Sequence, residues 1–288
     1  MTGLLVVESG PSLLVQDQGR FGWAHLGVPP SGALDPSALR LANRLVGNSE
    51  GAAGLEILLG GCVLRAEGSL RIALTGAAMS LRVGGHPAPW GQPVSVRAGD
   101  RVEVGGAVDG LRSWLAVSGS IEAATVLGSQ STDTLTGLGP APVRSGDRLP
   151  VGRQPRDVPV AEAPGGRRTT GVCTVEMSLG PRADWFTERA LGVLTGSEYV
   201  VSSSSDRVAV RLDGPALERT DDAELPSEGI VTGAVQVPAS GSPLVFLADH
   251  PVTGGYPVVG VVDEVGLARC AQLRPGDRLA FEARVVRL

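Results

Sequence analysis

Polar and charged side chains crowd into residues 16–35. Two carboxylates, an arginine, a histidine and a serine lie within these twenty residues: Asp17, Arg20, His25, Ser31 and Asp35. Together they could form the rim of a polar pocket whose arginine holds an anionic group. Simpler roles compete with this interpretation. A helix N-cap is a sufficient explanation for Asp35, and Asp17 with Arg20 could be an ion pair that braces a turn.

A second polar segment runs from Ser203 through two further serines and Asp206 to Arg207, and Arg211 follows four residues later. In a strand these two arginines would lie on one face, where they would clamp a carboxylate or a phosphate. An ordinary pair of surface arginines explains the same pattern, so the sequence leaves both interpretations open.

Two further polar segments flank the continuous apolar run at residues 244–248. Because this run is apolar throughout, it is better interpreted as a strand buried on both faces. Asp249 follows the strand directly, so its carboxylate would lie beside the loop of Gly254 and Gly255. The loop glycines could equally serve the turn alone, and no partner for a general base is readable from the sequence. The polar residues of the two segments are Glu228, Gln236, Asp249, His250, Thr253 and Tyr256.

The chain contains no lysine, because all 25 basic residues are arginine. It therefore cannot tether biotin, form a Schiff base or supply the lysine of a P-loop. No GxxxxGK[ST], GxSxG or HExxH motif occurs, and the dispersed histidines have no zinc-ligand spacing, so no metal site is predicted. A net charge of −5 without a basic cluster argues against nucleic acid or an anionic membrane as a partner.

The three cysteines, Cys62, Cys173 and Cys270, are far apart and outside any CxxC pair. Because the cysteines are odd in number and not spaced as in a disulfide framework, disulfides are not expected. This favours a location in the reducing cytoplasm. The N-terminal residues carry no basic leader, so no signal peptide is predicted. No uninterrupted apolar run reaches the length that crosses a membrane.

Short strand patterns dominate the chain. Valines alternate at residues 92–96 and 101–104, joined by a short turn, and a similar alternation covers residues 279–285. Few helices are expected. The tripeptide Gly-Asp-Arg, typical of a turn that enters a strand, recurs at residues 99–101, 146–148 and 276–278.

The clearest helix signal is Asp35 followed by Pro36, an N-cap and first-turn pair, with Gly47 at the far end. These residues predict a helix over residues 36–46. Its apolar stripe consists of Leu39, Ala42, Leu45 and Val46. Shorter helices are predicted within residues 187–194 and 263–273.

Residues 153–168 are rich in proline, glycine and charge and have no periodicity, which is typical of a linker. The predicted organisation is an N-terminal β-rich half over residues 1–152 and a C-terminal β-rich half over residues 169–288. The predicted fold class is mainly β with a few short helices.

Many of these segments, taken in order, resemble the biotin-dependent carboxyltransferase-like family. This family includes the C subunit of prokaryotic 5-oxoprolinase, allophanate hydrolase subunit 2, the antagonist of the Kip sporulation-kinase inhibitor and the carboxyltransferase part of urea carboxylase. The sequence departs from the family at Val208-Ala209, where Met-Gly is common, and at His250, where an arginine is frequent. The resemblance covers nearly the whole chain and rests on QDQGRFGWAHLGVPPSGALD (16–35), LANRLVGN (41–48), LEILLGG (55–61), LTGA (74–77), LAVSGSI (115–121), LGSQST (127–132), SSSDRVAVRLDG (203–214), SEGIVTGAVQVP (227–238), LADHPVTGGYPV (247–258) and AQLRPGD (271–277).

The resemblance implies a cyclophilin-like β-barrel architecture and a cyclophilin-like partner, the B subunit of the oxoprolinase. In that enzyme the A, B and C subunits together open 5-oxoproline to glutamate with ATP, and this chain would be inactive or nearly so alone. One alternative is a carboxyltransferase subunit that moves carboxyl from biotin on a separate carrier to a urea-like amide. The other is a non-catalytic regulator that binds its B-subunit partner. No cofactor would be bound covalently in any of these roles.

The resemblance also implies roles for particular residues. For catalysis we expect Glu228, Asp249 and His25, with Glu228 or Asp249 as the acid or base. The residues expected to hold a small amide or lactam substrate are Asp17, Arg20, Ser31, Gln236, Thr253 and Tyr256.

Overall fold

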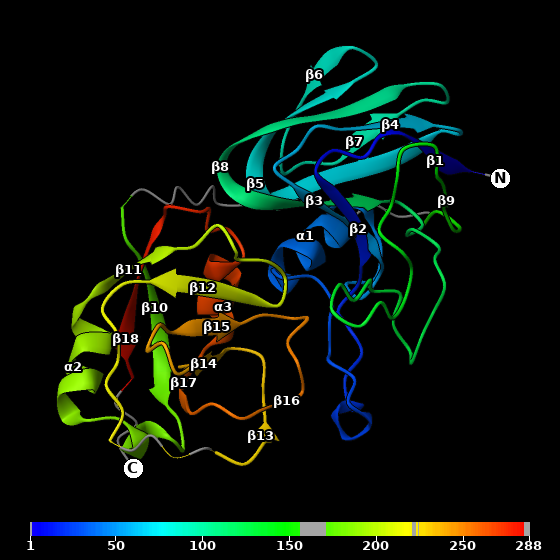
Figure 1. Cartoon of the computed structure of the whole chain (residues 1–288). Helices are drawn as coiled ribbons and strands as arrows, with labels where there is room; N and C mark the ends of the chain where they lie inside the picture. The colour runs from blue at the N-terminus through cyan, green and yellow to red at the C-terminus, as the bar shows by residue number, and fades with distance from the viewer. Residues whose placement is uncertain (1, 156–170, 221–222, 224, 285–288) are drawn as a thin grey trace. The chain divides into compact units, whose positions relative to one another are not determined.

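The computed structural model describes residues 2–155, 171–220, 223 and 225–284 (Figure 1). The chain splits into two compact units. Unit 1 contains Met1–Arg20 and Ser31–Arg168, and unit 2 contains Phe21–Pro30 and Thr169–Leu288. Residues 21–30 thus group with the second unit, although they were predicted to belong to the first half. Residues 156–168, most of the predicted linker, lie outside the described residues, so the linker stays a prediction.

Unit 1 is built on a nine-stranded sheet. Its two longest strands pair along most of their length, and the pairing is interrupted by bulges. The first part of β8 alternates between buried and exposed residues, and its last part is continuously buried, as expected for a strand that becomes covered on both faces. The strands are β1 (Gly3–Glu8), β2 (Ser12–Gln16), β3 (Gly54–Leu58), β4 (Cys62–Ala66), β5 (Leu70–Val83), β6 (His86–Ala88), β7 (Val94–Val96), β8 (Arg101–Val117) and β9 (Arg148–Pro150).

The alternating valines at residues 94–104 do not form a hairpin with each other. Strand β7 pairs with β5, and β8 pairs with β3, β4 and β5. The short turn between β7 and β8 therefore joins two strands that both find their partners elsewhere in the sheet. Alternation predicted both strands correctly but carries no information on which strand each one pairs with.

Helix α1 (Pro36–Val46) follows the predicted pattern. The Asp35 carboxylate accepts a hydrogen bond from the Ala38 N–H at 2.9 Å, and Gly47 ends the helix with a φ of 81°. The predicted apolar stripe is buried, and three of its residues pack against alanines of β5 and β8: Ala42, Leu45 and Val46 against Ala73 and Ala116.

Unit 2 contains a closed barrel of seven strands in the order β10-β17-β14-β15-β12-β11-β18 (Figure 1). A parallel pairing of β10 with β18 closes it, and all other neighbours are antiparallel. The strands are β10 (Cys173–Leu179), β11 (Glu198–Val201), β12 (Ala209–Asp213), β14 (Ala234–Gln236), β15 (Leu244–Phe246), β17 (Val258–Val262) and β18 (Arg278–Ala283).

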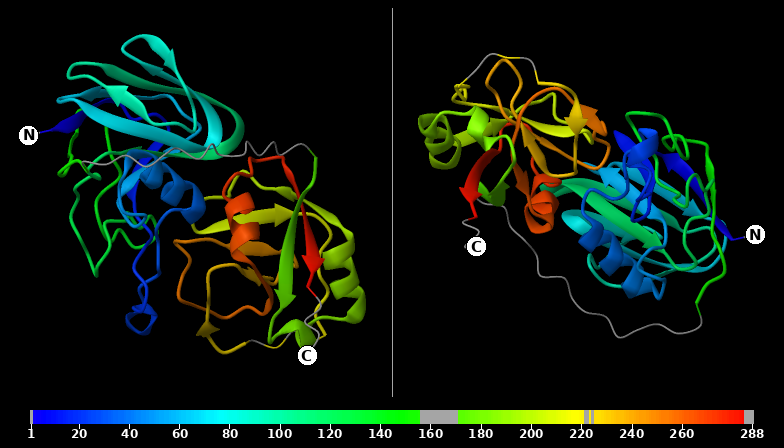
Figure 2. Two further views of the ribbon diagram at one scale, coloured as in Figure 1. Left: turned by 180° about the vertical axis from the view of Figure 1, so that it is seen from behind. Right: turned by 90° about the horizontal axis from the view of Figure 1, so that it is seen from below.

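Shorter elements complete unit 2. Helix α2 (Glu188–Gly196) packs beside β18 and α3 (Glu264–Cys270) beside β10, as Figure 2 shows. Both helices begin where predicted, because Thr187 and Asp263 accept N-capping hydrogen bonds from their first turns. Two short strands pair outside the barrel, and two single-turn helices occur: β13 (Glu228–Gly229) with β16 (Thr253–Gly254), η1 (Ala24–Leu26) and η2 (Ala183–Trp185).

The Gly-Asp-Arg tripeptides all form the same turn. In each, the aspartate carboxylate accepts a hydrogen bond from the N–H of the residue three positions earlier, at 2.7–2.8 Å. The glycine adopts a φ of 90–96°, and the arginine is the first residue of a strand. The repeat is therefore explained by its turn, as predicted, at Asp100, Asp147 and Asp277.

The prediction of a mainly β chain with a few short helices is confirmed. Two β-rich units and a β-barrel are present, and the barrel belongs to unit 2. All three cysteines are buried, free thiols. Among the described residues, no helix has the length and apolar character needed to cross a membrane.

Candidate functional site

The residues predicted to form a site divide between the two units. Asp17, Arg20 and Ser31 belong to unit 1. The other predicted residues belong to unit 2: His25, Glu228, Gln236, Asp249, Thr253 and Tyr256. Each unit therefore contains its own group of predicted residues.

In unit 2, strand pairing brings together residues that are far apart in the sequence. In the β13–β16 ladder, Glu228 lies opposite Gly254 and Gly229 opposite Thr253. The ladder continues with a hydrogen bond from the Ile230 N–H to the Val252 carbonyl at 2.8 Å. The Glu228 and Thr253 segments, predicted separately from the sequence, are therefore neighbours.

Gln236, at the end of β14, ties the same loop to the barrel. Its buried side chain donates a hydrogen bond from Nε2 to the Tyr256 carbonyl at 3.0 Å. A Cβ on Gly254 would lie only 2.9 Å from that Nε2 atom, so the Gly-Gly loop passes close to the amide because it lacks side chains. The loop glycines thus have a packing role in addition to forming the turn.

Two arginines flank these residues. Arg182 donates hydrogen bonds to both carboxylate oxygens of Glu228, from Nε at 3.0 Å and also from Nη2. The Arg219 guanidinium lies 5.8 Å from the centre of the Tyr256 ring and donates to the Val237 carbonyl. We call this group the β13–β16 cluster: Arg182, Arg219, Glu228, Gln236, Thr253 and Tyr256.

The Arg182 contact determines the electrostatics of Glu228. Its hydrogen bonds and charge lower the pKa of the Glu228 carboxyl below its usual range, while partial burial opposes the shift. The same contact raises the pKa of Arg182. Glu228 is therefore ionised at neutral pH, and about a third of its side chain is exposed, so it can meet a ligand from solvent.

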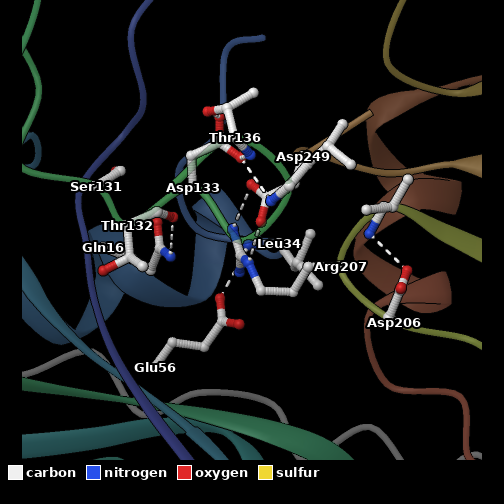
Figure 3. A network of polar contacts seen from close by, with 12 residues as sticks. Gln16, Leu34, Glu56, Ser131, Thr132, Asp133, Thr136, Asp206, Arg207 and Asp249 are labelled. Atoms are coloured by element: carbon white, nitrogen blue, oxygen red, sulfur yellow. Dashed lines mark hydrogen bonds and ion pairs between the residues drawn. The ribbon is translucent and has the colours of Figure 1, made fainter. Parts of the chain in front are cut away.

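Asp249 is in a different environment from Glu228. It is fully buried, and its two oxygens accept hydrogen bonds from Arg207 Nε at 2.9 Å and Nη2 at 3.2 Å (Figure 3). This is the paired geometry in which a guanidinium binds a carboxylate most strongly. Residues 244–248 are all buried, as predicted, but strand β15 ends at Phe246, so Asp249 lies in the turn that follows and not directly at the strand end.

Neither interpretation that the sequence left open for Arg207 and Arg211, a clamp or a pair of surface arginines, fits the structure. Arg207 is buried and precedes β12, whereas Arg211 is exposed within it. The two side chains do not share a face, because the strand begins only after Arg207. Arg207 contributes instead to the ion pair with Asp249.

The two histidines of unit 2 also differ. His250 is buried, with Nε2 3.1 Å from Thr232 Oγ1 and Nδ1 2.8 Å from the Pro251 carbonyl oxygen. Burial lowers its pKa, against the opposing effects of the Pro251 carbonyl and Asp249. His25 is exposed on η1, with Nδ1 3.1 Å from the Gly22 carbonyl oxygen, and stacks on Trp23. The pairing of β13 with β16 does not involve η1, so it does not bring His25 into the β13–β16 cluster.

In unit 1, Asp17 is the centre of a hydrogen-bond network rather than the partner of an exposed arginine. Its oxygens accept hydrogen bonds from the N–H groups of Gly19 and Gln130 and from the hydroxyls of Ser129 and Ser131, at 2.6–2.8 Å. Asp17 thereby fixes the loop that contains the motif LGSQST.

Arg20 and Ser31 lie beside this network. Arg20 is buried and donates from Nη2 to the Ser131 carbonyl. Ser31 is buried and has a φ of 51°, in the left-handed region that residues other than glycine rarely adopt. The three unit 1 residues predicted to bind substrate therefore share one buried polar neighbourhood.

Sequence reasoning missed Arg182 and Arg219 in unit 2 and the serines at positions 129 and 131 in unit 1. Neither arginine lies in a recognisable motif, and each becomes significant only through a partner distant in the sequence. The serines lie in LGSQST, a segment that supported the family resemblance but suggested no role by itself.

The β13–β16 cluster offers an ionised carboxylate, two guanidinium groups and a buried amide beside a glycine loop. Such a set can hold a small polar molecule, with the arginines for an anionic group and Glu228 for proton transfer. The cluster adjoins the seven-stranded barrel of a mainly β chain.

The chain belongs to the carboxyltransferase domain family, subdomains A and B, whose family model matches residues 26–283. It is 37% identical over 281 residues to the 5-oxoprolinase C subunit of Escherichia coli (strain K12), covering 96% of this chain and 90% of that protein. It is 29% identical to the urea amidolyase of Saccharomyces cerevisiae, covering 97% of this chain but 16% of that protein.

Solved structures show the same fold. The chain matches the structure named TTHA0988 with a TM-score of 0.89 and 37% identity, over 98% of its own length. It spans 55% of that longer chain. The K. lactis urea amidolyase matches with a TM-score of 0.91 and 28% identity, over 97% of this chain and 18% of that one.

Proposed function

We propose that this chain is the C subunit of an ATP-dependent 5-oxoprolinase, which opens 5-oxoproline to glutamate together with its A and B subunits. The observation that carries the proposal is the 37% identity to the Escherichia coli 5-oxoprolinase C subunit, which extends over nearly the full length of both chains. A second protein of that name, from Haemophilus influenzae, is 32% identical over 98% of this chain.

The β13–β16 cluster suits a lactam that carries a carboxylate. Opening the ring requires a base and the stabilisation of an oxyanion. Arg182 and Arg219 are our candidates for binding the substrate carboxylate, with Gln236, Thr253 and Tyr256 shaping the loop around the ring. Glu228 is our candidate base, because its ionised side chain reaches solvent.

The other two residues expected to be catalytic rank below Glu228. Asp249 is buried and held by Arg207, so its proposed role is to support the barrel end of the adjoining loop. His25 is exposed and lies on a single turn of helix, where a partner protein could reach it. Because the chain has no lysine, only its arginines could contact the ATP phosphates, and the buried thiols suit a complex in the cytoplasm.

A carboxyltransferase role is the second candidate. The family model and the urea amidolyase matches favour it, because both describe this region as part of proteins named for carboxyl transfer or urea breakdown. In that case biotin would be carried by another polypeptide or domain, because this chain has no lysine to attach it.

The test is to purify the chain with the A and B subunits and to measure ATP hydrolysis with and without 5-oxoproline. We expect hydrolysis only when 5-oxoproline is present and a large loss of kcat in Glu228→Gln. Glu198→Gln is the matched control, because Glu198 pairs with Arg278 at a surface site of the same unit.

Other outcomes would select the other two roles. Turnover that ignores 5-oxoproline but responds to urea with a biotinylated partner would establish the carboxyltransferase. A stable complex without turnover on either substrate would favour a regulator that binds the B subunit.

A further inference from the structure

Arg20 is a buried arginine whose guanidinium group is only partly hydrogen-bonded among the described residues. Only 2% of the residue is exposed, and its Nη2 donates to the Ser131 carbonyl. Its Nε and Nη1 atoms have no hydrogen-bond partner among the described residues. Buried polar groups are nearly always paired, and a buried charge without partners is costly.

Three other unpartnered polar atoms lie on the segments that surround Arg20. They are Ser31 Oγ, Thr132 Oγ1 and Gln16 Oε1, all buried and without a hydrogen-bond partner in the part of the chain that the structure describes. The Gln16 amide donates to the Thr132 carbonyl at 2.9 Å, which places these two side chains on adjoining segments (Figure 3).

The segment of Ser31 is packed against the segment of Arg20. A Cβ on Gly32 would lie 2.8 Å from the Gly19 nitrogen, and the Ala33 N–H donates to the Asp17 carbonyl at 2.9 Å. The unpartnered atoms are therefore gathered in one region of unit 1. We call this group the Arg20 cluster: Gln16, Arg20, Ser31 and Thr132.

The Asp17 carboxylate does not act as the hydrogen-bond partner of the unpartnered Arg20 nitrogens. Its carboxylate already accepts four hydrogen bonds, from the Gly19 and Gln130 N–H groups and from the Ser129 and Ser131 hydroxyls. No hydrogen bond from Arg20 Nε or Nη1 reaches it within the described ranges. Among the described residues, nothing pairs with the Nε and Nη1 groups of Arg20, so these donors and the positive charge can serve a bound molecule.

We propose that the Arg20 cluster binds a small carboxylate-type monoanion that also carries one hydrogen-bond donor. The cluster has a single cation, which matches one negative charge better than two. Arg20 supplies donors for the anionic oxygens, and the Ser31 and Thr132 hydroxyls can donate or accept. Gln16 Oε1 accepts only, so the ligand must offer it an O–H or an N–H. Bicarbonate and a carboxylate beside a lactam N–H both have this chemistry.

The site is closed in this conformation, because each unpartnered atom is almost fully covered. Gly139 contributes to the cover, since a Cβ there would lie 3.0 Å from Arg20 Nη2. Gly139 follows a turn that Asp133 caps with hydrogen bonds from the Leu135 and Thr136 N–H groups. A ligand would enter by displacing this turn, whose residues 134–137 are exposed.

The test measures binding to the full chain alone by isothermal titration, at constant ionic strength set with sodium chloride. Bicarbonate and 5-oxoproline are the two candidate anions, acetate is a monoanion without the donor, and sulfate is a dianion. We expect bicarbonate or 5-oxoproline to bind, and acetate and sulfate to bind at least about tenfold more weakly. The one that binds shows whether the Arg20 cluster accepts bicarbonate or the carboxylate of a lactam.

Variants connect the binding to the cluster. Arg20→Gln should weaken it at least about tenfold, whereas Arg44→Gln, at an exposed pair with Glu50, should leave it unchanged. If Arg20→Gln does not fold, Ser31→Ala and Thr132→Val remove the free hydroxyls and should each weaken binding. Absence of binding by both candidates, equal binding of acetate, or binding retained in all three variants would overturn the proposal and leave water as the partner of these atoms. The result does not depend on whether the complex opens 5-oxoproline.

Discussion

Arg182 and Glu228, 46 positions apart in the sequence, form an ion pair with hydrogen bonds to both carboxylate oxygens. The pair joins the segment before η2 to the β13–β16 ladder of unit 2. It keeps Glu228 ionised and places a guanidinium beside the carboxylate that we propose as a base. The effect of this pair on stability can be measured by unfolding the chain, and its effect on activity by the kcat of the complex.

The contribution of Glu228 to stability should depend on pH. Its folded pKa is lowered from 4.5, so its stabilising effect is complete above that value and is lost as the pH falls through the folded pKa. The difference in urea midpoint between the wild type and Glu228→Gln should therefore be smaller at pH 4 than at pH 7. A difference that does not change with pH would contradict the assignment.

Breaking the buried ion pair of Arg207 and Asp249 should be strongly destabilising. Asp249→Leu leaves a buried guanidinium without the Asp249 carboxylate, which typically costs about 3–5 kcal/mol of unfolding free energy. The double variant Arg207→Leu/Asp249→Leu removes both charges and should recover part of that loss. Urea unfolding of both variants checks this. A double variant less stable than the single one would show that the pair is not the cause.

His250 should make stability fall on mild acidification. Burial lowers the pKa of His250 below 6.5 in the folded chain. As the pH falls through 6.5, this histidine is therefore protonated in the unfolded chain before it is protonated in the folded chain, which favours unfolding. Unfolding free energy should drop between about pH 6.5 and 5 in the wild type and drop less in His250→Gln. His86→Gln, at an exposed site of unit 1, is the control and should behave as the wild type.

Gln236 should matter for activity through the loop that it holds. Gln236→Leu removes the hydrogen bond to the Tyr256 carbonyl and frees the segment of Thr253 to Tyr256. We expect kcat/KM for 5-oxoproline to fall about tenfold to a hundredfold in the complex, because small displacements of binding groups are costly. The exposed Gln92→Ala is the control. Unchanged kinetics in Gln236→Leu would remove this residue from the proposed site.

Gly139→Ala should destabilise more than Gly137→Ala. The two glycines have φ values of 82° and 75°, so alanine is strained at either position, with a cost of about 1 kcal/mol or more. A Cβ added at Gly139 meets the Ser131 carbonyl and the Arg20 side chain, whereas no atom of the described residues lies within 4 Å of one added at Gly137. Equal losses in chemical denaturation would show that the close approach of Gly139 to the Ser131 carbonyl and Arg20 does not matter.

Elements that depend on a few neighbouring residues were predictable from the sequence. The helix from Pro36 to Val46 was found because its N-cap, its first-turn proline and its terminal glycine all lie within the segment. The Gly-Asp turns at Asp100, Asp147 and Asp277 were found for the same reason, since each carboxylate bonds three residues back. Each of these capping and turn patterns involves only neighbouring residues, so it can be recognised without knowing the fold.

The partners of the polar residues were decided only by tertiary structure. Arg182 meets Glu228 across 46 positions, Arg207 meets Asp249 across 42, and Arg20 meets the Ser131 carbonyl across 111. These contacts depend on strand order, register and barrel closure, which alternation along one strand does not encode. The sequence alone therefore determined the composition of the chain, its turns and its absence of lysine. The fold determined which carboxylates are paired with arginines, and which buried arginine retains N–H groups without a partner among the described residues.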